Sequence, residues 1–375
     1  MLAGGEPTTG RVVRVKGAVS EFDTPQRVPI STEANAKIDL HFDDPWNNPV
    51  FEVANRFDKA AWLAALHSKN GRYSAKLRDV RGHVNRFTGY AITKYYPHIG
   101  FLGSLSDRDI RVLVELQIEA GCNVITIPEP SPNCTPAAFG TNLETFWEYA
   151  SRISQDVAVM PYVHIAQDPA KFKAKLKAIA DHEHALWCLG LVYASPVHYR
   201  PNYLHIAEFG HHDVWVHCSG VRKYQSHVHP VSQLHSVQFF GVDSVALAVP
   251  RAFYNRGGED AGAMPVSTPT PSDVRYFVRK SLDYPKLAQV CDGGKPLPCP
   301  CPACGRKTLD DTVAGLAALG TGAEPTFQIR ALSKIHDVYA STAEFEIART
   351  EISESRLAEY YKSKPAMRAF LGLPE

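Results

Sequence analysis

Short apolar runs that recur about every 25 to 35 residues are the feature that most constrains how this chain can fold. The runs are continuous rather than alternating and are rich in β-branched and aromatic residues, as expected of parallel strands buried on both faces. They read HIGFLG at 98–103, NVITIPEP at 123–130, VAVMPYVHI at 157–165, LWCLGLVYA at 186–194, VWVHCSG at 214–220 and VQFFGVDSVALAV at 237–249. The sequence therefore predicts a parallel sheet across the middle of the chain.

Helical patterns separate these runs. In the clearest, at 106–121, Ser106 is a candidate N-cap, the apolar residues have helical spacing and Gly121 is a stop signal. Further helices are expected at 142–154, 168–185, 229–237 and 332–352. The repeated alternation favours an α/β fold of the (β/α)8 TIM-barrel type, as a single domain over 1–375. A doubly wound sheet would give the same alternation, but no GxGxxG or GxxxxGK[ST] loop supports its nucleotide-binding form.

The composition is that of a soluble globular protein, with 45% hydrophobic and 21% charged residues. No stretch approaches the roughly 20 apolar residues of a membrane helix, and the first residues lack the apolar core of a secretory signal. We therefore expect a cytoplasmic enzyme, located in the host cytoplasm if a virus encodes it, with no membrane partner. The net charge of +1 neither indicates nor excludes a nucleic-acid partner.

A cysteine cluster in LPCPCPACGRK places Cys299, Cys301 and Cys304 as C-x-C-x-x-C. In a reducing compartment, clustered thiols are more often metal ligands than disulfides. Three thiolates so close together converge on one tetrahedral Zn²⁺, and His336 on a predicted helix is the best fourth ligand. Cys291 is the alternative fourth ligand, and unpaired thiols or a disulfide are the alternative to a metal.

A Cys₃His set leaves no open coordination position, so the predicted zinc is structural and not catalytic. It would fix a zinc-binding subdomain at about 290–345, near the C-terminus, to the helices that follow.

The same motif resembles the zinc site of the tRNA-guanine transglycosylase superfamily, and the resemblance covers roughly residues 75 to 345. FFGVDSVALAV resembles the family's strand with the nucleophilic aspartate, where Asp243 and Ser244 match. LGLVYASPVHYRP resembles the strand and loop that usually read V-Q-G-S and contact the base, with Tyr193 in the place of Gln. LRDVRGHV weakly matches the D-S-G-G-F-Q loop, which makes Asp79 the counterpart of the second aspartate.

NVITIPEP resembles the family's strand with a base-recognising aspartate, but it contains no Asp, so Glu129 or Thr126 would have to serve. These departures are similar to the DNA-acting branch, whose members insert 7-deazaguanines such as 7-cyano-7-deazaguanine into DNA. The resemblance thus implies exchange of guanine for a 7-deazaguanine in DNA. The same reaction on tRNA, and a non-catalytic nucleic-acid-binding subunit of the same fold, are the alternatives. A helicase-like or ATPase partner and a homodimer remain open.

Base exchange that keeps the sugar configuration requires two displacements at C1′, as in a retaining glycosidase. Asp243 is the expected nucleophile, at the carboxyl-terminal end of a predicted strand, where barrels present catalytic groups. Asp79 is the expected acid/base that protonates the departing guanine. A turn-capping role for Asp243 and a solvated position for Asp79 are the alternatives.

Tyr193 is expected to stack on or hydrogen-bond an extruded base, and its alternative is a core position. Phosphate contacts are expected from Arg222, Lys223 and Arg275, although such groups also occur on solvated faces. The lysines at 171, 173, 175 and 177 lie along one predicted helix and are expected to form a solvated face.

Overall fold

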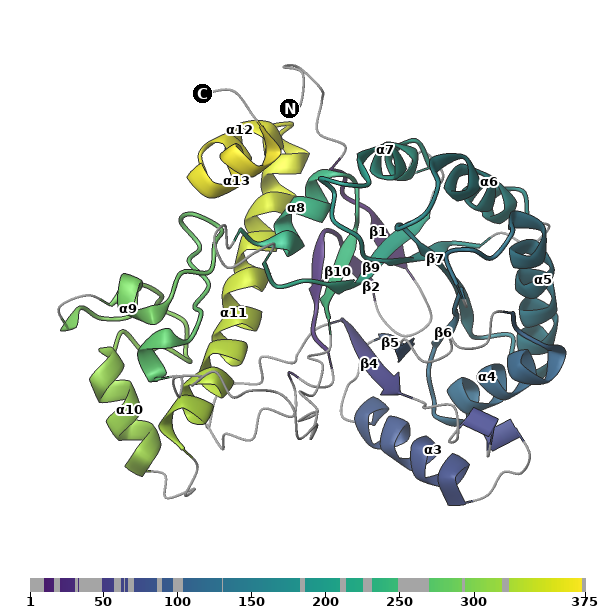
Figure 1. Cartoon of the computed structure of the whole chain (residues 1–375), viewed down its shortest axis with the longest axis horizontal. Coiled ribbons are helices and arrows are strands. Elements are labelled where there is room, and N and C mark those ends of the chain that lie inside the picture. The colour runs from purple at the N-terminus through teal and green to yellow at the C-terminus, as the bar shows by residue number, and fades with distance from the viewer. Residues whose placement is uncertain are drawn as a thin grey trace, which may run out of the picture.

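The computed structural model of the chain has a mixed α/β architecture, in which helices surround the outer side of a parallel sheet (Figure 1). It describes residues 10–16, 21–30, 33, 49–56, 62–63, 65–66, 71–85, 90–96, 104–129, 131–182, 186–209, 214–224, 231–248, 270–291, 294–318 and 324–372.

The sheet contains eight strands within these residues, and all of its strand pairs are parallel. The strands are β3 (Gln26–Val28), β4 (Val50–Arg56), β5 (Tyr90–Tyr96), β6 (Val124–Ile127), β7 (Ala158–His164), β8 (Cys188–Val192), β9 (Trp215–Val221) and β10 (Ser244–Leu247). Strands β4 to β10 are neighbours in chain order, and β3 lies on the other side of β10. A short antiparallel pair, β1 (Arg14–Lys16) and β2 (Glu21–Asp23), precedes the sheet.

The two ends of this strand order meet beyond β3. Ile30 forms a parallel bridge with Glu52 of β4, and the Glu52 N–H donates to the Pro29 carbonyl at 2.9 Å. Strands β3 and β4 are therefore linked to each other, although they stand at opposite ends of the hydrogen-bonded order.

The helices divide into two sets. Those that alternate with the strands are α3 (Gly71–Val84), α4 (Asp107–Glu119), α5 (Pro136–Ile153), α6 (Pro169–Ala180), α7 (Arg200–Phe209) and α8 (Gln233–Phe239). The C-terminal set is η2 (Pro271–Asp273), α9 (Leu287–Val290), α10 (Leu309–Ala318), α11 (Pro325–Ser353), α12 (Leu357–Lys362) and α13 (Pro365–Leu371). Figure 1 shows the long helix α11 standing between the sheet and the segment that contains α9 and α10.

Most of the predicted strands are confirmed. Strands β6 to β8 fall inside the apolar runs that begin at residues 123, 157 and 186, and β9 extends one residue beyond the run at 214–220. The run at 98–103 lies outside the described residues. The strand predicted over the last run, at 237–249, is partly wrong. The first residues of this run form the end of helix α8, and only Ser244–Leu247 form a strand. A continuous apolar run has no period, so it does not show where a buried helix stops and a buried strand begins.

The predicted helix at 106–121 is also confirmed. The Ser106 hydroxyl accepts from the Asp109 N–H, and the Asp109 carboxylate accepts from the Ser106 N–H at 2.9 Å, which completes a capping box. Gly121 follows with a φ of +86°, a left-handed conformation that favours glycine and ends the helix.

Helix α8 carries a buried histidine at its contact with α11. The His235 ring stacks between Phe277 and Phe345, with centroid distances of 5.5 and 4.9 Å, and its Nδ1 lies 2.9 Å from the Ser232 hydroxyl. Burial lowers the pKa of His235 to about 3, although Glu344 acts in the opposite direction. The neutral ring is therefore the form that the fold accommodates.

This histidine should make the fold sensitive to acid. Its folded pKa lies below the ordinary value of 6.5, so its contribution to stability is complete above pH 6.5 and is lost as the pH falls toward about 3. Between pH 7 and 5, the unfolding free energy of the wild type should fall as the pH falls. We expect His235→Phe to lower this slope by up to about 1.4 kcal/mol per pH unit. Urea titrations at each pH measure this slope. His205→Gln, a change at a partly exposed histidine on α7, is the control. An unchanged slope in His235→Phe would contradict the assignment.

Candidate metal centre and strand-end residues

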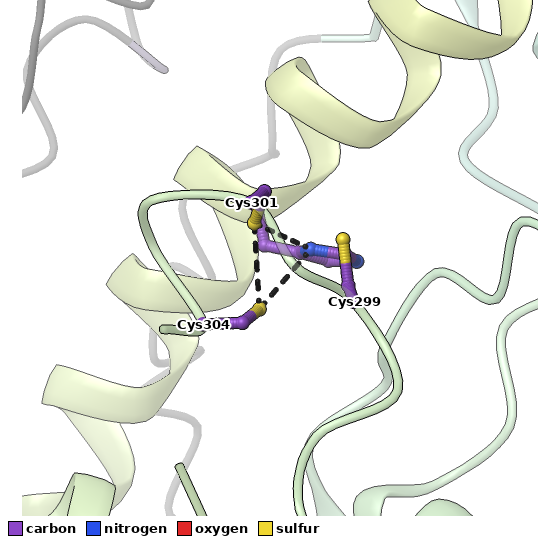
Figure 2. Close-up of side chains that lie close together, drawn as sticks. Cys299, Cys301 and Cys304 are labelled. Carbon is purple, nitrogen blue, oxygen red and sulfur yellow. Dashed lines mark hydrogen bonds between the residues drawn. The ribbon is translucent and has the colours of Figure 1, made fainter. Parts of the chain in front are cut away.

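The three cysteines of the predicted cluster converge from one loop toward helix α11 (Figure 2). The Cys301 and Cys304 sulfurs lie 3.5 Å apart, and each lies 3.4 Å from Nδ1 of His336. With Cys299, the four ligand atoms all lie within 4.8 Å of one another. This buried Cys₃His group could hold a metal ion. It includes His336 rather than Cys291, and its cysteines are free thiols rather than a disulfide.

The loop is shaped by a tight turn after the last cysteine. Gly305 and Arg306 both have left-handed backbone conformations, with φ values of +57° and +56°. The N–H groups of Cys304 and Gly305 donate to the Cys301 carbonyl at 3.0 Å each. These bonds fold the loop back on itself and bring Cys301 and Cys304 to the same side.

The protein orients His336 from several directions. Its Nε2 lies 2.9 Å from the Phe277 carbonyl, which leaves Nδ1 directed at the sulfurs. The Tyr276 ring stacks on the imidazole with a centroid distance of 4.0 Å and an interplanar angle of 7°. Burial acts to lower the pKa of His336, but hydrogen bonds to Cys299 and Cys301 outweigh it and raise that pKa to about 9.

Asp243 does not lie where we predicted. Strand β10 begins at Ser244, so Asp243 stands before the amino-terminal end of the strand, and the expectation of a carboxyl-terminal position is wrong. Its side chain is fully buried and pairs with Arg11 through Nε at 2.9 Å and Nη2 at 2.6 Å. It also accepts from the Val216 N–H at 2.7 Å.

Burial raises the pKa of Asp243 to about 6, while Arg11 acts to lower it. Asp243 therefore lies buried and paired with a guanidinium at the amino-terminal end of β10, whereas ligands of parallel α/β sheets bind at the carboxyl-terminal strand ends.

Asp79 lies on the exposed side of helix α3, not in a loop beside Asp243. Its carboxylate is 61% exposed and lies 3.8 Å from Nε2 of His83, one turn further along the helix. The structure therefore gives Asp79 and Asp243 separate partners and does not bring them into one site.

Glu129 is bound within the protein. Its carboxylate accepts from the His164 N–H at 2.6 Å and forms a fully buried ion pair with Lys175, which also donates to Gln167 at 2.7 Å. Burial raises the pKa of Glu129, and Lys175 opposes that rise. The expectation that Lys175 belongs to a solvated face is wrong. Its spacing from Phe172 shows why, because both belong to the i, i+3, i+4, i+7 set that helix α6 buries.

Thr126 is also buried and bonded within the protein. Its N–H donates to Oε1 of Gln117 at 2.6 Å, and its carbonyl accepts from Nε2 of the same side chain at 3.0 Å. These bonds fasten β6 to helix α4. The base-binding role expected of Thr126 stays a prediction.

Tyr193 occupies a different kind of position. It directly follows β8, is half-buried, and its hydroxyl donates to Oε1 of Gln233 at 2.9 Å. Burial raises the pKa of Tyr193, so the phenol keeps its proton. Arg222 directly follows the neighbouring strand β9 and is exposed. The carboxyl-terminal ends of two adjacent strands are thus followed by an aromatic ring and a guanidinium.

The other two expected phosphate contacts have partners inside the protein. Lys223 pairs with Asp337 at 2.7 Å and lies over the Tyr284 ring. Arg275 donates to the Tyr284 carbonyl at 2.8 Å and lies over the Tyr224 ring. Both cations hold the C-terminal segment to the sheet.

No protein-family model matches this chain, and no curated protein matches it significantly. Within the residues that the structure describes, no helix is both long and apolar enough to cross a membrane.

The Arg11–Asp243 pair should be measurable as a stabilising contact. Asp243→Ala leaves a largely buried guanidinium without its carboxylate, and we expect a loss of about 2 to 4 kcal/mol in unfolding free energy. Arg11→Ala should cost less when Asp243 is already absent, so a double-mutant cycle should give a favourable coupling energy. Glu148→Ala, which removes an exposed pair with Arg152, serves as the control and should change stability little. If Asp243→Ala unfolds at the wild-type denaturant concentration, the structural role is excluded.

Proposed function

We propose that this chain is a nucleic-acid-binding protein in which an extruded base is held at the carboxyl-terminal ends of β8 and β9. The observation that carries the proposal is the placement of Tyr193 and Arg222 directly after these two adjacent parallel strands. A half-buried phenol ring can stack on a base, and an exposed guanidinium can contact phosphate.

The proposal includes closure of the sheet into a (β/α)8 barrel. The parallel bridge between Ile30 and Glu52 and the hydrogen bond from Glu52 to Pro29 support it. In such a barrel, the carboxyl-terminal strand ends form one mouth, so Tyr193 and Arg222 would face a common ligand.

We further propose that the Cys₃His group holds a structural Zn²⁺. Tetrahedral zinc with Zn–S near 2.3 Å and Zn–N near 2.0 Å implies S–S and S–N separations of about 3.8 and 3.5 Å. The distances of 3.5 Å between Cys301 and Cys304 and 3.4 Å from either to His336 lie within a few tenths of an ångström of those values. Four protein ligands leave no position for water or substrate, so the ion would supply only cross-linking of the loop to helix α11.

Exchange of guanine for a 7-deazaguanine in DNA, or in tRNA, is the second candidate function. The Cys₃His group and its transglycosylase-like spacing favour it. Its covalent route requires a carboxylate next to C1′. Asp243 and Glu129 are each held in an ion pair with their side chains fully buried, and Asp79 is exposed on helix α3. Asp243 also lies at the opposite end of β10. We therefore propose that the described residues bind a base without exchanging it through Asp243.

Removal of the metal should loosen the C-terminal segment. We expect chelation of the purified protein to lower its melting temperature and to increase proteolysis between β10 and α11, because the loop loses its cross-link to His336. Cys304→Ser should reproduce both effects. Cys188→Ser, a change at a buried thiol inside β8 that is not part of the cluster, should respond to the chelator as the wild type does. A melting temperature that is equal with and without chelator would exclude the structural metal.

Binding and exchange can be separated in one set of assays. We expect fluorescently labelled single-stranded DNA to bind with an affinity that depends on salt. Tyr193→Ala and Arg222→Ala should each weaken binding by about tenfold, because one stacked base or one phosphate contact contributes about 1 to 3 kcal/mol. Arg222→Ala should also lower the slope of log affinity against log salt by about 1. Arg152→Ala, at an exposed arginine near the end of α5, is the control.

The parallel assay incubates labelled 7-cyano-7-deazaguanine with DNA or tRNA and digests the polymer to nucleosides. We expect no label in either polymer. Label that disappears in a folded Asp243→Asn variant would restore the nucleophile and overturn the proposal. Label that persists in that variant would establish an enzyme with a different nucleophile. Absence of nucleic-acid binding would exclude both candidate functions.

A further inference from the structure

We infer that Tyr276 is a positioning residue for the metal centre, which fixes His336 by stacking and supports the Cys304 thiolate by a hydrogen bond. The inference rests on the proposed metal at the Cys₃His group and adds a residue that contributes no ligand. Tyr276 is buried, and its hydroxyl lies 3.0 Å from the Cys304 sulfur.

The direction of this hydrogen bond follows from metal binding. Either atom can donate in the metal-free group, but a metal-bound cysteine is a thiolate and has no proton to give. The Tyr276 hydroxyl must then donate to the Cys304 sulfur. Hydrogen bonds to an ionised acceptor are stronger than those between neutral groups, so metal binding and the Tyr276 contact should strengthen each other.

The stacking contact acts on a second ligand. The Tyr276 and His336 rings are almost parallel, with a centroid distance of 4.0 Å. The next residue, Phe277, offers its carbonyl to Nε2 of His336 at 2.9 Å. Ring and carbonyl together restrict rotation of the imidazole, which keeps Nδ1 directed at the sulfurs. Such outer partners of a metal-bound histidine orient the ring and fix its tautomer.

The backbone that presents Tyr276 is itself well anchored. The Tyr276 N–H donates to the Pro285 carbonyl at 3.0 Å. The preceding residue, Arg275, accepts at its carbonyl from the Ser333 hydroxyl of α11 at 2.7 Å. Residues 275–277, which we call the strap, therefore contact helix α11 or the cysteine cluster at every position. Because Ser333 precedes His336 by one turn, the strap and the cysteine loop hold the same part of the helix.

A positioning role makes a prediction that simple packing does not. Loss of the hydroxyl should leave the fold and the stacked ring in place but should increase electron density on the Cys304 sulfur. It should also weaken metal retention, since removal of an outer partner of a metal ligand typically lowers metal affinity by 10- to 100-fold.

The test uses the full chain loaded with Zn²⁺ and compares Tyr276→Phe with Tyr361→Phe. Tyr361 is a matched control because it is buried and its hydroxyl donates to Gln238, away from the cluster. We expect zinc transfer to a chromogenic chelator to be about tenfold faster in Tyr276→Phe and unchanged in Tyr361→Phe. Tyr276→Leu, which also removes the stacked ring, should release zinc faster than Tyr276→Phe.

A second measurement uses Co²⁺ in place of Zn²⁺. The thiolate-to-cobalt charge-transfer band should shift in Tyr276→Phe and stay in place in Tyr361→Phe, because only the first change removes a hydrogen bond to a ligand sulfur. Zinc release and a cobalt band identical to wild type in Tyr276→Phe would overturn the inference while leaving the metal site intact. A wild-type chain that retains neither Zn²⁺ nor Co²⁺ would refute the metal site and the inference with it.

Discussion

Helix α11 is held to the rest of the molecule by two neighbouring residues that reach different partners. His336 points into the cysteine loop, and Asp337 pairs at 2.7 Å with Lys223, the second residue after the end of β9. Further along the same helix, Glu344 pairs with Arg279 at 2.7 Å and with Lys364 at 3.1 Å. The helix thus joins the cysteine segment, the sheet and the C-terminal helices, and each depends on the others through it.

The metal centre was predictable because most of it is local. Three cysteines within six residues can all bind one metal ion. Gly305, directly after the last of them, is the sequence signal for the tight turn. His336 required only a helix that returns to the loop. Tyr276 was not predictable, since a tyrosine more than 20 residues before the cluster has no local feature that links it to a thiol. Its role arises from packing between segments that are distant in sequence.

The error at Asp243 has a specific physical origin. The run VQFFGVDSVALAV is apolar throughout because α8 and β10 are both buried there, so hydrophobicity does not divide it. Gly241 was the usable signal, since it has a φ of +85° and stands three residues before the strand. Gly121 has the same relation to β6, with Asn123 where Asp243 stands, and the carbonyls of both polar residues accept from a neighbouring strand at 2.9 Å. A glycine followed two residues later by Asn or Asp marks a turn into a strand in both places.

The positions that the structure gives to the predicted site residues change which of them are candidates for contact with a ligand. Glu129 and Lys175 neutralise each other in a buried pair, and a buried charge deprived of its partner is costly, so neither is available to a ligand without loss of stability. Tyr193 is uncharged and Arg222 is exposed, so a ligand could contact either one without separating a buried ion pair. Arg222 is adjacent in sequence to Lys223, which Asp337 holds from the turn of α11 that also bears His336. Any displacement of that turn when the metal is lost would be transmitted through this ion pair to the end of β9. The metal centre is therefore remote from the strand ends in sequence but connected to them through one helix turn and one salt bridge.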